Sequence, residues 1–398
     1  MRMYPTKVKV ALQNISLKAI IFVYNHILKR RWIKSSKVLI VRIDALGDFV
    51  IFSPLIKCYK DLFGDKNTYF LLNRKIKQLA QILIHPDQII EFDDNMFKTS
   101  LLYKLKLFFK LYIEKYTTTI HPTFSRNIKG DLLVASTCAI RKIGYDGDLQ
   151  NYHNNTQKMI GSKVYTKIIS NNPNTTNEIG INRYFINEIG STINLDPLPK
   201  FEPTQDQTLK LKLFLQKTGV RDGQLYVIIH PGASHNFKRW PIQKYITIID
   251  YIINSFGYHC IITGSFDEKY LSQYLDNTNK KIIDLIGKTS IEEVLTLLKG
   301  SIFCLSNDTA TVHLSSAVGT PVICVMGGGN LKRFFPYGDI HINRIVYDDD
   351  KASCQNDNWA CLNGSLDKIA PCLQNITTTQ VKDEINELLK YLNKNPHE

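Results

Sequence analysis

Residues 229–241 form a polar loop with residue types that suit the binding of a diphosphate. Gly232, Ala233 and Ser234 have small side chains or none, so an anion can approach the backbone closely. Lys238 follows them and adds a mobile point charge, which suits a pyrophosphate better than the planar fork of an arginine. The loop lies between an apolar run and a helical pattern, where unpaired backbone N–H groups favour a phosphate-bearing ligand. The alternative interpretation is a surface turn with a solvated lysine.

A second polar loop, residues 307–313, has the same setting between a strand pattern and a helix pattern. Asp308, Thr309 and Ala310 open the helix, and His313 lies one turn into it. Taken singly, Asp308 can be an N-cap and His313 a packed, hydrogen-bonded histidine. Two such loops at the carboxyl ends of neighbouring strands in one βαβ series lie at one edge of a sheet. Together they predict a nucleotide-binding site.

Alternating apolar runs and amphipathic stretches predict the elements that hold these loops. In the second half, strands are expected at residues 225–229, 260–263, 302–305 and 322–326. One helix is expected to begin at Pro241 and end at Gly257, and another to begin with a capping box at Ser290 and end at Gly300. In the first half, strands are expected at 38–43, 68–72, 89–92 and 117–120, helices at 49–63, 76–84 and 101–113, and a long loop at 146–178. This alternation indicates an α/β protein with parallel sheets and right-handed crossovers.

Length and composition agree with two domains. The chain has 398 residues, of which 44% are hydrophobic, enough for two cores. Repeated prolines at residues 196–203 predict an extended linker. We therefore expect a basic amphipathic leader at 1–36, an N-terminal domain at 37–203 and a C-terminal nucleotide-binding domain at 204–398.

A third motif gives these patterns a family resemblance. Residues 42–48 have the sequence Arg-Ile-Asp-Ala-Leu-Gly-Asp after the first strand. With the two loops in this order, the chain resembles glycosyltransferase family 9, the bacterial ADP-heptose:lipopolysaccharide heptosyltransferases, over about residues 37–381. The resemblance implies the GT-B fold, with two Rossmann-like, doubly wound parallel-sheet domains facing a central cleft. It also implies an inverting transfer of a sugar, first of all heptose, to a lipopolysaccharide core or related surface glycan.

The resemblance assigns roles to individual residues. Asp48 would be the general base for the acceptor hydroxyl, although an N-cap at the same turn is the alternative. Asp44 would raise the pKa of the Asp48 carboxyl by like-charge repulsion, and Arg42 would oppose that rise. The sequence does not determine which effect is larger. Lys238 would stabilise the departing diphosphate. Donor-binding positions would be Gly232, Ala233, Ser234, Thr289, Asp308, Thr309, Ala310 and His313, with Ser265 to Glu268 near the ribose; acceptor-binding positions would be Arg126 and Lys129, beside Arg141 and Lys142.

The expected ligands are a nucleotide sugar and a lipid-linked glycan. No Asp-x-Asp pair is placed to hold a divalent ion between phosphates, so we expect catalysis without a metal or cofactor, with ADP-heptose as substrate. The same chemistry with another sugar or acceptor, in a capsule, an O-unit or a protein, remains open. A nicotinamide-dependent oxidoreductase is disfavoured, because no Gly-x-Gly-x-x-Gly follows the first strand.

The formal charge of +14 is concentrated at the N-terminus. Residues 1–37 contain no Asp or Glu and nine basic residues: Arg2, Lys7, Lys9, Lys18, Lys29, Arg30, Arg31, Lys34 and Lys37. The apolar part of this leader is too short and too polar to span a bilayer, and no cleavage site follows it. It either lies in the headgroup region of the inner membrane or packs on the catalytic domain. No nucleic-acid motif accompanies the charge, so nucleic acid is not an expected partner. We expect a cytoplasmic enzyme that works at or near the membrane face.

The eight cysteines indicate a reducing compartment. Cys260, Cys304 and Cys324 lie in apolar strands and are expected to be small core residues. The other notable group is Cys354, Cys361 and Cys372 in a polar loop. Their spacing does not match a zinc site, and free thiols, a disulfide or a metal-bound finger all remain open.

Overall fold

The computed structural model describes residues 35–152, 154–218, 220, 223–276, 278–349, 359, 362 and 367–395. The leader expected at residues 1–36 therefore lies almost entirely outside the described residues, as do Cys354 and Cys361. The chain divides into two compact units, with the boundary between Pro197 and Leu198. Among the described residues, no helix is both long enough and apolar enough to cross a membrane.

The N-terminal unit is built on a six-stranded parallel sheet with the strand order β3-β2-β1-β4-β5-β6. The order reverses between β1 and β4, which makes the sheet doubly wound. The strands are β1 (Val38–Arg42), β2 (Thr68–Asn73), β3 (Ile89–Phe92), β4 (Thr118–His121), β5 (Arg141–Tyr145) and β6 (Lys167–Ile169).

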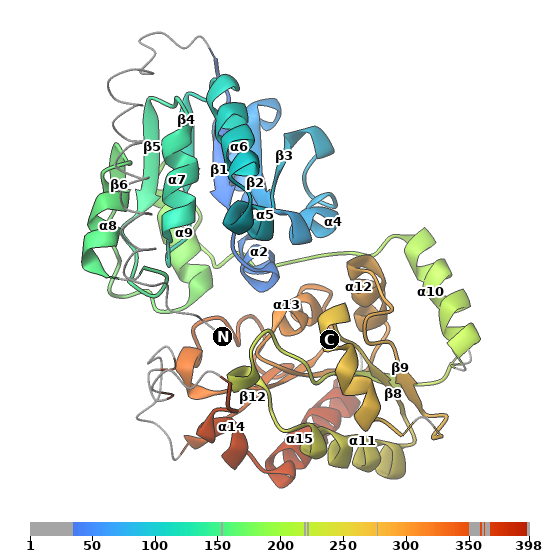
Figure 1. Ribbon diagram of the computed structural model, residues 1–398. Helices are drawn as coiled ribbons and strands as arrows, with labels where there is room; N and C mark the ends of the chain where they lie inside the picture. Colours follow the sequence, from blue (N-terminus) through green and yellow to red (C-terminus); the bar gives the residue numbers. More distant parts are fainter. Residues whose placement is uncertain are drawn as a thin grey trace. The chain divides into compact units, whose positions relative to one another are not determined.

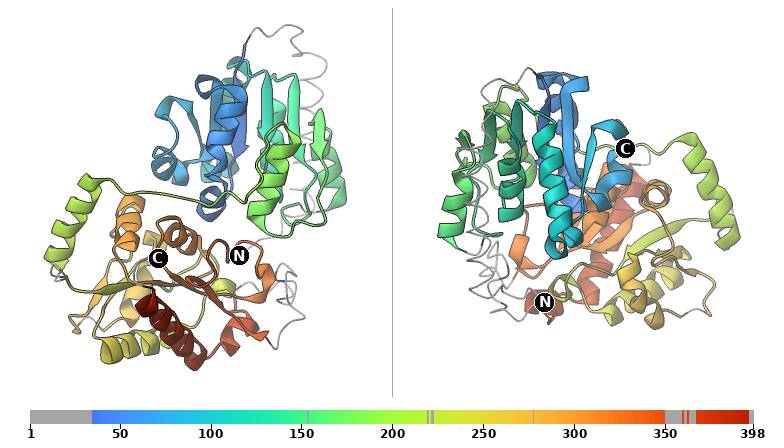
Figure 2. Two further views of the ribbon diagram at one scale, coloured as in Figure 1. Left: turned by 180° about the vertical axis from the view of Figure 1, so that it is seen from behind. Right: turned by 45° about the horizontal axis from the view of Figure 1, so that its top comes forward.

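Helices cover both faces of this sheet (Figures 1 and 2). They are α2 (Leu46–Phe52), α3 (Leu55–Phe63), α4 (Lys77–Ala80), α5 (Asp94–Thr99), α6 (Leu101–Ile113), α7 (Ile128–Ser136), α8 (Asn155–Ser162) and α9 (Glu178–Glu188), with single 3-10 turns η2 (Asp65–Asn67), η3 (Arg74–Ile76) and η4 (Pro86–Gln88). Every residue of β1 is buried, as expected for a central strand covered on both faces.

The C-terminal unit repeats the same architecture. Its parallel sheet has the order β12-β11-β10-β7-β8-β9 and reverses between β10 and β7. The strands are β7 (Tyr226–His230), β8 (His259–Ile262), β9 (Ile282–Asp284), β10 (Cys304–Asn307), β11 (Val322–Val325) and β12 (Asn343–Val346). The helices are α10 (Gln205–Thr218), η5 (Asn236–Lys238), α11 (Ile242–Phe256), η6 (Phe266–Tyr274), α12 (Ile291–Lys299), α13 (Ala310–Ala317), η7 (Gly328–Asn330), α14 (Pro371–Asn375) and α15 (Thr378–Lys394).

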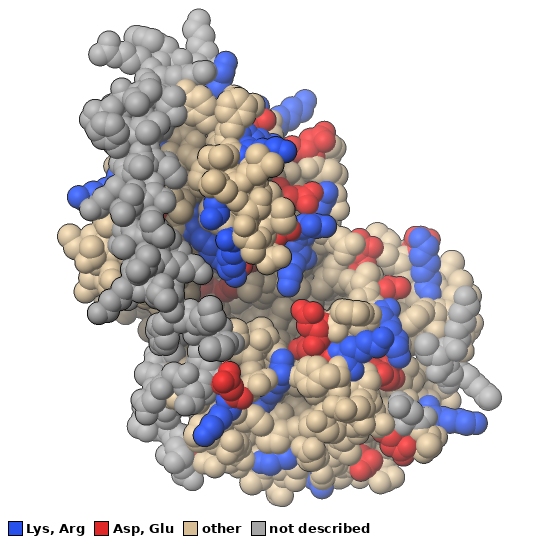
Figure 3. All heavy atoms as spheres, viewed as in Figure 1, with Lys and Arg blue, Asp and Glu red and all other residues tan. Residues whose placement is uncertain are grey.

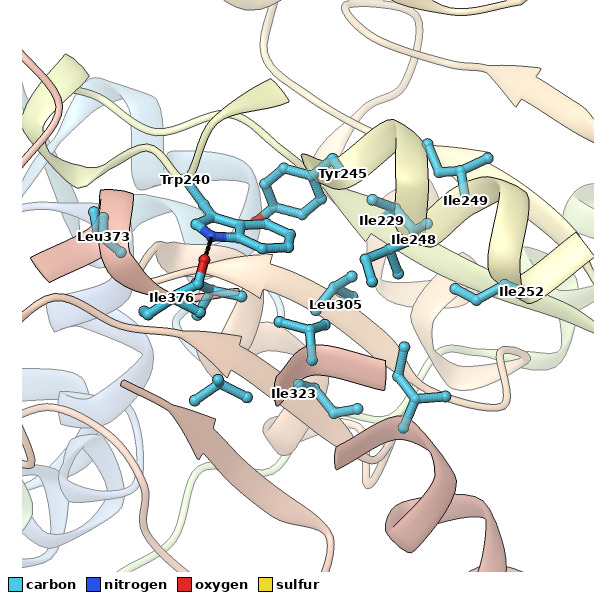
Figure 4. Packing of buried hydrophobic residues seen from close by; sticks show 14 of the residues in the cluster. Ile229, Trp240, Tyr245, Ile248, Ile249, Ile252, Leu305, Ile323, Leu373 and Ile376 are labelled. Atoms are coloured by element: carbon cyan, nitrogen blue, oxygen red, sulfur yellow. Dashed lines mark hydrogen bonds between the residues drawn. The ribbon is translucent and has the colours of Figure 1, made fainter. Parts of the chain in front are cut away.

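Trp240 anchors the core of the C-terminal unit. Its side chain is 1% exposed, and its indole N–H donates to the Ile376 carbonyl at 3.0 Å. Figure 4 shows the ring between isoleucines and Tyr245 of α11 on one side and Leu373 on the other. The tryptophan directly follows the polar loop, so the core fixes the end of that loop.

Several elements match their prediction closely. Strand β3 and helix α6 have the expected bounds, and Ser290 forms the expected capping box at the start of α12. Gly257 ends α11 with a φ of 73°, the left-handed conformation that glycine adopts readily. Cys260, Cys304 and Cys324 are buried core residues, also as expected.

Two local predictions are wrong. The single helix expected at residues 49–63 is two helices, because Pro54 has no backbone N–H and interrupts the helical ladder. The expected loop at 146–178 contains α8 and β6. Strand β6 has only one buried residue, Ile169, and so lacks the apolar pattern that marks a strand in the sequence.

Candidate functional site

The predicted donor residues cluster where the second sheet reverses its strand order. The loop after β7 carries Gly232 to Ser234 and Lys238, and the loop after β10 carries Asp308 and Thr309. These two strands are hydrogen-bonded neighbours, with Ser306 opposite His230. Such a switch point leaves a crevice at the carboxyl ends of the strands, where α/β proteins bind ligands.

Asn307, the last residue of β10, ties the two loops together. Its side chain is completely buried, and its amide nitrogen donates to the carbonyls of Pro231 at 2.8 Å and Gly232 at 3.0 Å. Its amide oxygen accepts from the backbone N–H of Trp240 at 2.9 Å. One side chain therefore holds both ends of the loop after β7. Sequence reasoning assigned Asn307 no role, although an amide at the end of a buried strand must find partners somewhere.

Lys238 and Asp308 form an ion pair across the switch point. The Lys238 ammonium lies 3.2 Å from Asp308 Oδ2, and the two side chains are 21% and 10% exposed. Asp308 is not the N-cap considered for it; Thr309 is, with its hydroxyl accepting from Thr311 N–H at 3.3 Å. The cation thus lies at the start of α13, where the helix dipole is positive. A lysine beside a helix N-terminus is a suitable site for an anion.

The small residues of the first loop have distinct positions. Gly232 and Ala233 are buried, whereas Ser234 is exposed. The Arg239 guanidinium turns back and donates from Nε to the Ala233 carbonyl at 2.8 Å, which closes the loop. A Cβ atom at Gly232 would lie 2.1 Å from Glu268 Oε1, so a larger residue here would have to displace the Glu268 side chain.

Glu268 and Thr289 extend the cluster along the sheet edge. Glu268, in η6 after β8, is buried and accepts from the backbone N–H and hydroxyl of Ser265 at 2.7 and 2.8 Å. Thr289 is half-buried, after β9 and directly before the N-cap of α12. Because β10, β7, β8 and β9 are consecutive in the sheet, the predicted donor residues all follow strands along one edge.

His313 is the packed histidine that the alternative interpretation describes. It is 4% exposed, and its Nδ1 lies 3.2 Å from the Tyr337 hydroxyl, with the two rings stacked at 5.8 Å between centroids. Its ring also meets Phe335 edge-on. This packing fixes the middle of α13 and holds the helix N-terminus in place.

Trp359 lies near the Lys238 loop, a position that sequence reasoning missed. Its ring is 5.0 Å from that of Phe237 and 6.0 Å from the Lys238 ammonium. A Cβ atom at Gly329 would lie 2.4 Å from the indole, so the glycine run at 327–329 makes room for this ring. Cys372 is buried near the same place, and its sulfur accepts from the Gly328 N–H at 3.4 Å. The described residues contain no group of three His, Cys, Asp or Glu side chains that could hold a metal ion.

In the N-terminal unit, Asp48 lies in the first turn of α2. It is the third residue of that helix and is half-buried. Its Oδ2 accepts from the Ala45 backbone N–H at 3.1 Å. The carboxylate therefore satisfies a donor at the helix start although Ala45, not Asp48, is the N-cap.

A buried arginine organises the surroundings of Asp48. Arg42, the last residue of β1, is completely buried, with its Nε 2.9 Å from Asp44 Oδ2 and its guanidinium 3.8 Å from Glu178. It also donates to the Asp48 carbonyl at 3.4 Å. Burial raises the pKa of Asp44 to about 7, and the negative charge of Asp48 adds to the rise although Arg42 opposes it. For the Asp44 carboxyl, desolvation thus outweighs the attraction of Arg42.

Two of the four basic residues predicted near the acceptor, Arg126 and Lys142, are buried, whereas Arg141 is exposed. Arg126 is fully buried: its NH1 donates to Asp131 Oδ1 at 2.8 Å, and its guanidinium lies 4.7 Å from the Tyr165 ring. Lys142 is also buried, and burial lowers its pKa to about 7. Neither side chain is accessible to an acceptor in this structure. Lys129 is about one-third exposed and pairs with Asp94.

Sequence comparison identifies the family. Residues 125–360, more than half of the chain, match the family model described as glycosyltransferase family 9 (heptosyltransferase). The chain belongs to glycosyltransferase family 9. A curated relative, lipopolysaccharide heptosyltransferase 3 of Escherichia coli K12, is 32% identical over 127 residues. That segment covers 31% of this family 9 chain and 36% of the relative, so about a third of the relative's length is matched.

Solved structures of the family share the fold. E. coli ADP-heptose lps heptosyltransferase II superposes with a TM-score of 0.67 at 14% identity, covering 89% of this chain and 99% of that one. E. coli heptosyltransferase WaaC with ADP-2-deoxy-2-fluoro heptose gives a TM-score of 0.61 at 18% identity, covering 88% and 99%. The predicted GT-B fold with two Rossmann-like units and the predicted family are therefore confirmed.

The pKa of Asp44 predicts a pH dependence of stability in this family 9 chain. The folded pKa of about 7 exceeds the ordinary value of 3.8, so between these values the folded state binds a proton that the unfolded state does not. The free energy of unfolding should therefore fall as the pH rises from about 4 to about 7, and Asp44→Asn should lose this part of the fall. Urea unfolding across that range checks it, with the exposed Asp61→Asn as control. Parallel curves for the wild type and Asp44→Asn would contradict the assignment.

Arg126 is predicted to stabilise the fold. Arg126→Met should lower the free energy of unfolding by about 3–5 kcal/mol, because it leaves the buried Asp131 carboxylate uncompensated. The control Lys129→Met removes a partly exposed pair and should cost less than about 1 kcal/mol. Thermal and urea unfolding measure both. Normal stability of Arg126→Met with a raised KM for acceptor would instead favour the acceptor role.

Proposed function

We propose that this chain is an inverting, metal-independent heptosyltransferase that moves heptose from ADP-heptose to a lipopolysaccharide core or related surface glycan. The observation that carries the proposal is the Lys238 ammonium beside the N-terminus of α13, at the switch point of the second sheet. Family membership supports it, as do the names of the similar proteins, one of which is a heptosyltransferase with an ADP-heptose analogue.

In this proposal, Lys238 and the first N–H groups of α13 receive the charge of the departing ADP. Asp308 holds Lys238 in place while the site is empty, since the two are 3.2 Å apart. An entering diphosphate competes with Asp308 for the ammonium, and the carboxylate is then available to accept from a sugar hydroxyl. Because these donors are already oriented by Asn307 and Thr309, they need little rearrangement as charge develops.

Asp48 is the proposed general base. Its hydrogen bond from Ala45 N–H orients the carboxylate, and its second oxygen, Oδ1, can take the proton of the acceptor hydroxyl. Attack of that hydroxyl on the anomeric carbon breaks the bond to ADP and inverts the configuration there. The proton goes to Asp48 and the negative charge to the diphosphate, so no metal or cofactor is required by the scheme.

The proposed acceptor is a lipid-linked glycan, which is bound where the enzyme meets the cytoplasmic face of the inner membrane. Lys129 remains a candidate contact for an acidic group on it, because its side chain is partly exposed. Nucleic acid is not among the proposed partners. Transfer of a different nucleotide sugar, or transfer to a capsule, O-unit or protein acceptor, is the competing possibility that a donor panel separates.

A donor panel tests the proposed function. ADP-heptose should bind and turn over best among nucleotide sugars that differ in base and in sugar, and a chelator should not change the rate.

Lys238→Ala should weaken ADP binding by about tenfold or more and slow turnover as well, because the charge contacts the phosphates before and during departure. Lys210→Ala, which removes another ion-paired lysine of the same unit, should leave both unchanged. Unaltered ADP affinity of Lys238→Ala in calorimetry would refute the donor role of the loop.

Asp48→Asn tests the general base. The amide oxygen can still accept from Ala45 N–H, but the side chain can no longer take a proton. Turnover should fall by about a hundredfold or more with the melting temperature and donor affinity preserved. Asp61→Asn, an exposed carboxylate on α3, is the matched control. Activity of Asp48→Asn within about threefold of wild type would assign the base elsewhere.

A further inference from the structure

Helix α6 presents a wide apolar face to solvent. Five of its thirteen residues are large hydrophobic side chains that are roughly half exposed or more: Leu101 (69%), Leu102 (62%), Leu105 (56%), Phe109 (64%) and Ile113 (46%). We call these five residues the α6 apolar face. Leu101, Leu105 and Phe109 are spaced four residues apart, so they form a continuous stripe along the helix.

Among the described residues, α6 packs on the domain through its opposite side. The side of α6 that packs on the domain carries Leu107 (6% exposed) and Leu111 (0%), which belong to the core beneath α5 and α7. A helix packed on one side of a globular domain is normally polar on the other side. A contiguous exposed apolar patch of this kind marks an interaction site.

Lysines accompany the α6 apolar face. The helix contains Lys104, Lys106 and Lys110 and no acidic residue, and Lys98 and Lys115 lie just beyond its ends. Within the described part of the chain, neither Lys106 nor Lys110 is paired with a carboxylate. Figure 3, in the view of Figure 1, shows uncharged surface over α6 with basic side chains beside it.

We propose that the α6 apolar face is the surface with which this protein docks on an anionic lipid bilayer. The apolar side chains would enter the boundary between headgroups and acyl chains, and the lysines would contact lipid phosphates. At about 20 Å long, α6 is too short to cross the hydrocarbon core but suits a helix lying in the plane of the interface. This inference deepens the membrane part of the proposed function and does not depend on which sugar is transferred.

Charge complementarity favours a bilayer over a second copy of the chain. Two copies joined through this face would bring the lysines of one α6 close to those of the other, with no acidic residue in either helix to compensate. An anionic membrane supplies both the apolar environment and the opposite charge. Asp94 pairs with both Lys98 and Lys129, so a shared carboxylate connects the start of the α6 region to the candidate acceptor contact. Docking here would bring that lysine toward the membrane that holds a lipid-linked acceptor.

Vesicle binding by the full chain tests the docking surface. On vesicles of phosphatidylglycerol and phosphatidylcholine in equal parts, Leu105→Ser with Phe109→Ser should lower the partition coefficient by about tenfold or more. Lys106→Gln and Lys110→Gln should each lower it by about fivefold, and this effect should vanish at high salt. The matched control is Leu209→Ser with Leu213→Ser on α10, which changes two leucines of similar exposure, 59% and 53%, and should leave binding unchanged.

Further measurements on the same variants distinguish bilayer docking from coverage of the face by another part of the chain or by a second copy. Wild-type vesicle binding by the Leu105→Ser and Phe109→Ser variant would overturn the proposal. So would a lowered melting temperature, which would mean that another part of the chain covers the face, or dissociation of a dimer in sedimentation. We expect unchanged melting, unchanged sedimentation and unchanged turnover on a soluble, delipidated acceptor. Since vesicle binding needs no donor, absence of heptose transfer would count against the proposed function and leave this result intact.

Discussion

The buried side-chain amide of Asn307 is the interaction on which the donor loops depend. It lies at the end of β10, where the second sheet reverses its strand order, and it has no access to water. An amide buried without partners would cost about 1–3 kcal/mol for each unsatisfied group, so the surrounding backbone must meet it. The carbonyls of Pro231 and Gly232 and the N–H of Trp240 do so. The position of Lys238, two residues before Trp240, follows from that requirement.

The N-terminal unit places a different buried polar group at the equivalent point of its sheet. Arg42 is the last residue of β1, next to the reversal between β1 and β4. A buried guanidinium requires charge as well as hydrogen bonds, and Asp44 and Glu178 supply it. Burial raises the pKa of the Asp44 carboxyl to about 7 near the proposed base, although the charge of Arg42 opposes the rise. One unit therefore uses a neutral amide to hold loops, whereas the other concentrates ionisable groups around Asp48.

In both units, several buried or partly buried charged side chains have a partner of opposite charge. The buried Arg126 is matched by Asp131, and Lys238 is matched by Asp308. The lysines of α6 do not follow this pattern, because Lys106 and Lys110 have no carboxylate partner among the described residues and lie beside an exposed apolar face. In the docking proposal, an anionic lipid boundary would satisfy both features at once.

Elements with strong periodicity, and the polar loops between them, can be predicted from the sequence. Helix α6, strand β3, the capping box at Ser290 and the left-handed Gly257 all follow from neighbours in the chain, so they could be predicted from pattern. Strand β6 and helix α8 could not, because few of their residues are buried and the apolar pattern is weak.

The ion-pair partners and the burial of the charged residues can be seen only in the folded structure. The pairing of Lys238 with Asp308, seventy positions apart, and the complete burial of Arg126 depend on which strands become neighbours in the sheet. Local propensity acts over a few residues, whereas burial and ion pairing are set by contacts between distant segments. Residue type and spacing can therefore predict that a charged side chain is a candidate site residue. Its solvent exposure and its ion-pair partner depend on which strands are neighbours in the folded sheet.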